Sequence, residues 1–333
     1  MTLESSAHPM ISVVIPTKNG GPLFGRVLAR VLEQRIPGEL EVLVVDSGST
    51  DETLAIARQY PHVRLIEIPP QEFGHGKTRN LAVSQAKGEF VAMITQDALP
   101  ASSDWLLNMA APLLSNPSIA GVFGRHIAYP AASVFTRCEL EAHFDGFTRQ
   151  PVVHLDSPSR YANEESYRQF LYFFSDNNAM LRRSVWEEIP YPEVDFAEDQ
   201  AWARLIVEAG YHKAYAHGAV VYHSHDYALV ERLQRSFDES YALSRLFGYQ
   251  GGRGVKHAIR SLLALTRRDL KVSLQEGLLK SNPFIVLRMP FDNLMRILGS
   301  YLGQHAEKMP MALRLRLSRD RRLMKIDAWS NRP

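Results

Sequence analysis

The stretch that decides the fold of this 333-residue chain is residues 44–51, which read VVDSGSTD. It completes an apolar, β-branched run over residues 41–45, a pattern typical of a buried strand. Asp46, Ser47 and Gly48 then supply turn chemistry. Ser49 followed three residues later by Glu52 predicts a capping box at the start of a helix. The stretch therefore predicts a strand, a polar turn and a helix, which together form the repeating unit of an α/β sheet.

The same alternation extends on both sides of this stretch. We expect further strands at residues 11–16, 63–68 and 90–95, and helices at residues 22–32 and 77–87. Strands joined through helices imply right-handed crossovers and parallel pairing. Beyond residue 100 the patterns predict helices at 103–114, 197–209 and 229–247, strands at 119–127, 173–181 and 219–223, and a loop over 145–170. The fold class expected is α/β: a single Rossmann-like mixed sheet, mainly parallel and flanked by helices.

Composition excludes several classes of protein. The chain is 45% apolar and 22% charged, which is typical of a globular protein and not of a disordered or collagen-like one. A single cysteine, Cys138, excludes a disulfide framework and fits a reducing compartment. The first ten residues lack the features of a signal peptide. The most apolar stretch, residues 284–302, carries Arg288, Asp292 and Arg296, so no membrane span is expected.

The net charge of +2 is a sum over two unlike parts. Residues 251–333 carry 17 basic and 6 acidic residues, whereas residues 1–250 carry 21 basic and 30 acidic ones. The glycine-rich stretch 248–254 separates them and predicts a domain over 1–250 with a helical basic extension over 251–333. That extension either lies on an anionic membrane surface or packs on the body with a solvated basic face. It lacks the aromatic interleaving expected for nucleic-acid binding.

Polar side chains follow three of the predicted strands. Thr17 and Asn19 follow the first strand, Asp46 follows the second, and Gln96 and Asp97 follow the fourth. Each group taken singly could be a turn. Ligands of open parallel sheets bind outside the carboxyl ends of the strands, so the three groups together predict a binding edge.

Residues 74–80, GHGKTRN, lead into a helix with Lys77 and Arg79 in its first turn. Positive side chains there oppose the helix dipole, and a bound anion would offset that cost. A solvated basic turn is the alternative. The chain has neither a dinucleotide fingerprint nor a phosphate loop.

Candidate metal ligands are a carboxylate and two histidines. Asp97 ends a strand and can bind a hard cation that in turn holds phosphate oxygens. His223 and His225 lie two apart on an extended segment, so their side chains point the same way. The alternative interpretation is an ordinary strand end at the surface.

Two acidic groups are candidates for chemistry on an acceptor. Glu198 and Asp199 open a helix, where the dipole favours acids in any case, but one of them could serve as a general base. Residues 176–178, Asp-Asn-Asn, either bind hydroxyl groups or form a turn.

Together these motifs resemble family 2 glycosyltransferases, which have the GT-A fold, over about residues 10–250. Residues 13–19 (VVIPTKN) are similar to the family's first strand and nucleotide loop, and residues 44–51 to its second-strand signature. Glu198 and Asp199 with Trp202 are similar to its acceptor-side motif. The family's Asp-x-Asp is here Gln96-Asp97-Ala98, which leaves one carboxylate, so the resemblance implies a further ligand from His223 or His225.

Residues 73–80, 95–98 and 175–179 resemble the rhamnosyltransferase branch, whose members use dTDP-L-rhamnose in bacterial surface polysaccharide synthesis. The resemblance implies an inverting transfer to a lipid-linked or oligosaccharide acceptor, with Mg²⁺ or Mn²⁺. It implies a nucleotide half over about 10–100 and an acceptor half over about 101–250. It also implies a cytoplasmic enzyme, with a peripheral position on the inner face of the cell membrane as an open alternative. Asp199 is then the base and Glu198 its partner, and Asp97, His223 and His225 hold the metal. The donor-binding set is Pro16, Thr17, Asn19, Asp46, Ser47, Gly48, His75, Lys77, Arg79, Asn80, Gln96 and Asp97; the acceptor set is Asp176, Asn177, Asn178 and Trp202.

Three alternatives stay open at this point. Another nucleotide sugar could be the donor. The altered triplet at Gln96 also fits a non-catalytic nucleotide-sugar binding protein. A metallohydrolase using His223 and His225 would leave the signature around Asp46 unexplained.

Overall fold

The computed structural model describes residues 10–250 and 254–325 and divides into two compact units. The first unit contains residues up to 132, 137–194 and 198–224. The second contains residues 133–136, residues 195–197 and the chain from 225 onward.

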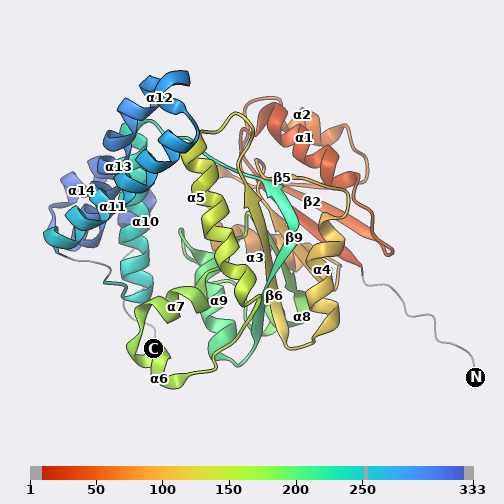
Figure 1. The fold of residues 1–333 in the computed structure, drawn as a ribbon. Helices are drawn as coiled ribbons and strands as arrows, with labels where there is room; N and C mark the ends of the chain where they lie inside the picture. The colour runs from red at the N-terminus through yellow and green to blue at the C-terminus, as the bar shows by residue number, and fades with distance from the viewer. Residues whose placement is uncertain (1–9, 251–253, 326–333) are drawn as a thin grey trace, which may run out of the picture. The chain divides into compact units, whose positions relative to one another are not determined.

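The first unit is built on one sheet (Figure 1). The strand order is β3-β2-β1-β4-β8-β6-β9-β5, and β7 pairs with β9. The strands are β1 Ile11–Thr17, β2 Leu40–Asp46, β3 Val63–Glu67, β4 Phe90–Ile94, β5 Leu99–Pro100, β6 Ile119–Ile127, β7 Val152–Val153, β8 Asn178–Arg182 and β9 His212–Tyr222.

Four strand pairs are parallel, namely β1–β2, β1–β4, β2–β3 and β6–β9. Strand β8 runs antiparallel between β4 and β6, and β5 and β7 pair antiparallel with β9. The α/β fold with a mixed, helix-flanked sheet is therefore confirmed. Strands β1, β2 and β4 are buried along nearly their whole length, as expected for parallel strands covered on both faces.

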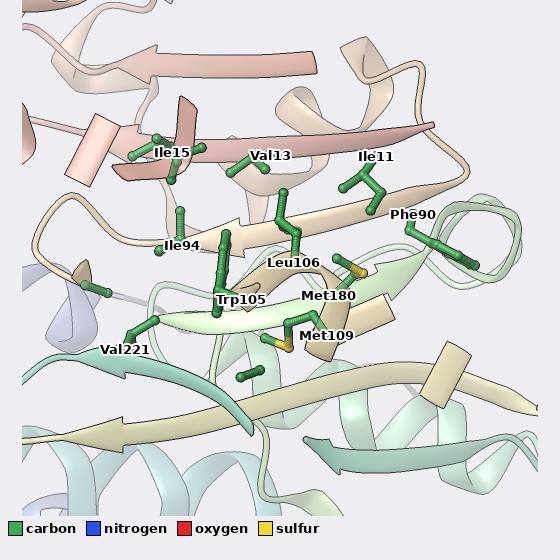
Figure 2. Close-up of a cluster of buried hydrophobic side chains, with 14 of the residues drawn as sticks. Ile11, Val13, Ile15, Phe90, Ile94, Trp105, Leu106, Met109, Met180 and Val221 are labelled. Atoms are coloured by element: carbon green, nitrogen blue, oxygen red, sulfur yellow. The ribbon is translucent and has the colours of Figure 1, made fainter. Parts of the chain in front are cut away.

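The first unit also contains helices. They are α1 Gly21–Leu32, α2 Thr53–Arg58, α3 His75–Gln85, α4 Trp105–Ser115, α6 Pro158–Asn163, α7 Glu165–Tyr172, α8 Arg183–Glu188 and α9 Glu198–Glu208; α5, Val134–Asp145, begins in the second unit. Figure 2 shows Trp105, Leu106 and Met109 of α4 packed among the side chains of the central strands. All three are 0% exposed, so this face of α4 belongs to the hydrophobic core of the first unit.

Several predicted elements are wrong in detail. Helix α2 begins at Thr53 without a side-chain cap, because the Ser49 hydroxyl bonds Asp46 instead of capping the helix. Helix α4 begins at Trp105, and Ser103 does not cap it. The expected loop over 145–170 contains a 3₁₀ turn, β7, α6 and most of α7. Strand β8 begins only at Asn178, since residues 173–177 form a loop.

The regular elements of the described part of the second unit are all helices or 3₁₀ turns, which confirms the helical C-terminal region. Its helices are α10 Leu229–Phe247, α11 Val255–Gln275, α12 Leu278–Ser281, α13 Pro283–Gln304 and α14 Met311–Leu317, with 3₁₀ turns at 306–308 and 321–325. Helices α10 and α13 pack closely because Gly299 and Gly303 lie against the backbone carbonyls of Leu233 and Phe237. No helix in the described part of the chain is both long and apolar enough to cross a membrane.

Candidate active site

The ends of β1, β2 and β4 meet at one edge of the sheet, as the sequence predicts. Thr17 and Asp46 are partners in the parallel register of β1 and β2. The Thr17 hydroxyl donates to Oε1 of Gln96 at 2.7 Å, and the Lys18 amide donates to the same oxygen at 2.8 Å. Gln96 therefore ties the loop after β4 to the loop after β1.

Asp46 shapes the turn that follows β2. Its side chain is 1% exposed and accepts hydrogen bonds from the amides of Gly48 and Ser49 at 2.9 and 2.8 Å, and also from the Ser49 hydroxyl. The turn is linked to the first loop because the Asn19 amide donates to Ser49 and the Thr50 amide donates to Asn19, each at 2.8 Å. Asp46 thus organises the turn at this edge of the sheet, and its direct contact with a nucleotide stays a prediction.

A buried cluster of charges gathers around Arg79 of α3. Its guanidinium Nε lies 2.8 Å from a carboxylate oxygen of Asp176, and NH1 pairs with Glu198. The Tyr191 hydroxyl donates to Asp176 at 2.9 Å. Burial alone would lower the pKa of Arg79, but Glu198 and Asp176 raise it above its usual value. The carboxylates of Asp176 and Glu198 thus pair with the Arg79 guanidinium and neutralise its positive charge. The sequence pattern predicts a bound anion in this role.

Asp199 borders this cluster but is only partly buried, unlike Glu198, which is 5% exposed. Its carboxylate accepts hydrogen bonds from the amides of Gln200 at 2.7 Å and Asp176 at 3.2 Å. Burial, then the negative charges of Glu198 and Asp176, raises the pKa of Asp199 well above the usual carboxyl value. A carboxylate with a raised pKa is a stronger base, so the arrangement suits proton abstraction.

Asp97 and His223 lie together at the ends of β4 and β9, with His223 Nε2 3.6 Å from Asp97 Oδ1. The Tyr129 hydroxyl donates to the Asp97 backbone carbonyl at 2.9 Å, which fixes the loop. A carboxylate oxygen beside an imidazole nitrogen is a donor set that fits a divalent cation such as Mn²⁺ or Mg²⁺. His225 is the first residue of the second unit, and its part in holding a metal stays a prediction.

Three predicted site residues have structural roles instead. Asn178 is 0% exposed, accepts from Trp105 Nε1 at 2.7 Å and donates to two backbone carbonyls, so its amide cannot bind acceptor hydroxyls. Trp202 is 0% exposed and donates to the Ile189 carbonyl. Asn80 donates to the Tyr191 carbonyl and accepts from the Tyr191 amide, which anchors the segment before α9.

The other predicted residues lie around this edge. His75 Nδ1 is 3.9 Å from a Glu198 oxygen, and Lys77 is exposed in the first turn of α3. Ser47 is buried and donates to the Thr17 carbonyl, whereas Pro16 and Asn177 are partly buried. Their contacts with a donor or an acceptor stay predictions.

Sequence reasoning missed three residues of the site. Tyr191 bonds Asp176, and Tyr129 holds the Asp97 loop, but neither belongs to a recognisable motif. His126 lies in β6 with its ring centroid 5.3 Å from that of His223. Burial, then the neighbouring His223 and His143, lowers the pKa of His126 well below its usual value, so it is neutral at physiological pH. His126 is a neighbour of His223 because β6 pairs with β9, and the sequence alone does not reveal this pairing.

Comparison with known proteins identifies the family. The sequence model of glycosyl transferase family 2 matches residues 12–189, which is more than half of the chain. The chain belongs to glycosyl transferase family 2. This glycosyltransferase is 34% identical to the O-antigen chain rhamnosyltransferase RfbN of Salmonella typhimurium, over 91% of this chain and 92% of that one. It is 30% identical to the O-antigen chain rhamnosyltransferase WbaN of Salmonella anatum, with the same coverage.

Solved structures support the GT-A fold of this glycosyltransferase. The mannosyltransferase PcManGT of Pyrobaculum calidifontis, solved with GDP-Man and Mn²⁺, matches with a TM-score of 0.58 and 20% identity over 91% of this chain and 87% of that one. TarS residues 1–349 of S. aureus, solved with UDP, match with a TM-score of 0.51 and 19% identity over 90% and 91%. At these identities the likeness concerns the fold alone.

Proposed function

We propose that this glycosyltransferase moves L-rhamnose from dTDP-L-rhamnose onto a hydroxyl group of a lipid-linked or oligosaccharide acceptor in bacterial surface polysaccharide synthesis, with inversion. The transferase activity follows from membership of glycosyl transferase family 2. The choice of rhamnose rests on the likeness, over nine-tenths of both chains, to two O-antigen rhamnosyltransferases.

The observation that carries the mechanism is the Asp199 carboxylate, which accepts hydrogen bonds from the Gln200 and Asp176 amides at the edge of a buried charge cluster and has a raised pKa. In the proposed reaction Asp199 takes the proton of the acceptor hydroxyl while that oxygen attacks the anomeric carbon. The bond from the anomeric carbon to the diphosphate oxygen breaks, and the electron pair leaves with the nucleotide diphosphate. A base placed in this way contributes roughly 10²–10⁴-fold to the rate.

Glu198 and Arg79 act on Asp199 from inside the protein. The ion pairs of Arg79 with Glu198 and Asp176 lock the start of α9, and the Asp176 amide holds Asp199 at 3.2 Å. Glu198 therefore orients the base and keeps its pKa high. We assign Glu198 and Arg79 as positioning residues.

The leaving diphosphate gains negative charge as its bond to the anomeric carbon breaks. Asp97 and His223 would hold a divalent cation, Mg²⁺ or Mn²⁺, with His225 as a further candidate ligand. Such a cation supplies Lewis-acid stabilisation of the leaving oxygens. Lys77, exposed in the first turn of α3, would add a positive charge from the protein itself to stabilise the leaving diphosphate.

The proposed place of work is the cytoplasmic side of the cell membrane, since a lipid-linked acceptor would be held there. The basic C-terminal extension supports this proposal, because basic segments are attracted to anionic lipid surfaces.

A donor screen tests the proposed substrate. We expect dTDP-L-rhamnose to raise the melting temperature of the full-length chain more than UDP-GlcNAc or GDP-mannose does, because a ligand that binds only the folded state stabilises it. The rise should be larger with Mn²⁺ or Mg²⁺ than with EDTA. Chromatography can measure the slow release of dTDP from dTDP-L-rhamnose. Release of dTDP would show that the protein is an enzyme and not only a binding protein. A larger shift with another nucleotide sugar would assign the donor to that sugar.

A further inference from the structure

Helix α11 of the second unit carries an exposed apolar stripe. Ile259, Leu263, Leu270 and Leu274 are 52%, 54%, 44% and 58% exposed. They are four, seven and four residues apart, a spacing that places all of them on one face of a helix. Single exposed apolar residues need no explanation, but four that line up on one face over four turns do.

A basic stripe runs beside the apolar one. Its members are exposed, and their spacings of four, seven and four residues repeat those of the apolar set: Lys256, Arg260, Arg267 and Lys271. The only acid in α11 is Asp269, which is 2% exposed and accepts from Asn293 of α13 at 2.9 Å. The charge that α11 presents to solvent is therefore entirely positive.

Another face of α11 is already used for packing. Asp269 and Ser273 are buried there, and Asn293 links that face to α13. Helix α13 in turn buries Val286 and Met289 while its first turns expose Phe284, which is 72% exposed. The apolar stripe of α11 is thus not needed for the helix-on-helix packing of the second unit.

We propose that the α11 face, defined as Ile259, Leu263, Leu270 and Leu274 with the basic stripe of Lys256, Arg260, Arg267 and Lys271, lies on an anionic lipid surface. An apolar stripe flanked by Lys and Arg is the pattern of helices that lie in the interface plane, with apolar side chains below the headgroups and cations among them. Anionic headgroups complement the charge that this face presents.

Two other occupants fit the face less well. A second copy packing stripe against stripe would bring the two sets of basic side chains together without acids to pair them. A nucleic acid would use the cations but would leave the leucines in water. The proposal names the α11 face as the surface that contacts the membrane. It rests on the proposed function, which suggests the membrane location.

The test is co-sedimentation of the full-length chain with phosphatidylcholine vesicles, with and without phosphatidylglycerol, in the absence of donor. One variant carries Ile259→Ser, Leu263→Ser and Leu270→Ser, and a second carries Arg260→Glu, Arg267→Glu and Lys271→Glu. Matched controls change exposed residues of the first unit: Leu107→Ser, Leu114→Ser and Val152→Ser, or Arg35→Glu, Lys87→Glu and Arg149→Glu. Thermal melting confirms that each variant is folded.

We expect wild type and controls to bind phosphatidylglycerol vesicles, and each α11 variant to lose affinity by about tenfold or more. Vesicle binding by the α11 variants equal to wild type overturns the proposal. Failure of the wild type to bind any vesicles also overturns the proposal. A wild-type dimer that the serine variant does not form, detected by sedimentation velocity, would then assign the α11 face to a second copy of the chain. Because no donor is present, these results are independent of which sugar the enzyme transfers.

Discussion

At the scale of single residues, the ionisation of Asp199 depends on its neighbours. Burial and the charges of Glu198 and Asp176 raise its pKa, so the carboxylate keeps its proton to a higher pH than an ordinary aspartate does. A general base works only when deprotonated. The rate should therefore fall as the pH falls through this raised pKa.

Glu198→Gln tests this control. The substitution removes one negative charge beside Asp199 and leaves the Arg79 charge less neutralised, and both effects lower the pKa of Asp199. We expect the acidic limb of the kcat/KM profile to move to lower pH, together with a reduced rate at neutral pH because α9 is held less firmly. Glu187→Gln, an exposed site with the same change of charge, should leave the profile in place. An unmoved acidic limb in Glu198→Gln would argue against the assigned role.

At the scale of elements, helix α3 and the segment before α9 must approach closely. A Cβ on Gly76 would lie 2.0 Å from the Pro192 carbonyl oxygen, and the Gly76 amide donates to the Val194 carbonyl at 3.3 Å. This contact involves backbone, which cannot move aside as a flexible side chain can. The contact holds α3, which carries Arg79, close to the segment that leads into α9, which carries Glu198.

Gly76→Ala should therefore destabilise the protein by roughly 1–3 kcal/mol, the usual cost of overpacking. Thermal melting measures the effect, and transferase activity should fall with it. Gly146→Ala is the matched control, because a Cβ there meets nothing within 4 Å. Equal melting temperatures for the two variants would show that the first turn of α3 moves freely.

Local patterns predicted the parts of this fold that are local. The VVDSGSTD stretch indicated β2 and its turn, and the polar strand ends do meet where Thr17, Asp46 and Gln96 lie together. The capping role of Ser49 was wrong because Asp46 competes for its hydroxyl. Arg79 was read as an anion ligand, since nothing near it in sequence reveals partners 97 and 119 residues away.

At the scale of the whole molecule, the net charge of +2 conceals an acidic part and a basic one. The acids to which we assign the chemistry in the proposed function, Asp97 and Asp199, lie in the first unit, whereas the exposed charge of α11 in the second is entirely basic. The boundary near residue 250 that the charge count suggests stays a prediction, and only the burial pattern of α11 shows which basic residues border exposed leucines.

The central claim is that this family 2 enzyme transfers rhamnose with Asp199 as the base, and Asp199→Asn tests it most directly. The measurement is single-turnover transfer from dTDP-L-rhamnose to a saccharide acceptor, with dTDP affinity measured in parallel by calorimetry. The account predicts a rate lowered by about 10²–10⁴-fold, because asparagine keeps the shape but cannot take the proton, with dTDP affinity nearly unchanged. A rate near that of wild type would contradict it.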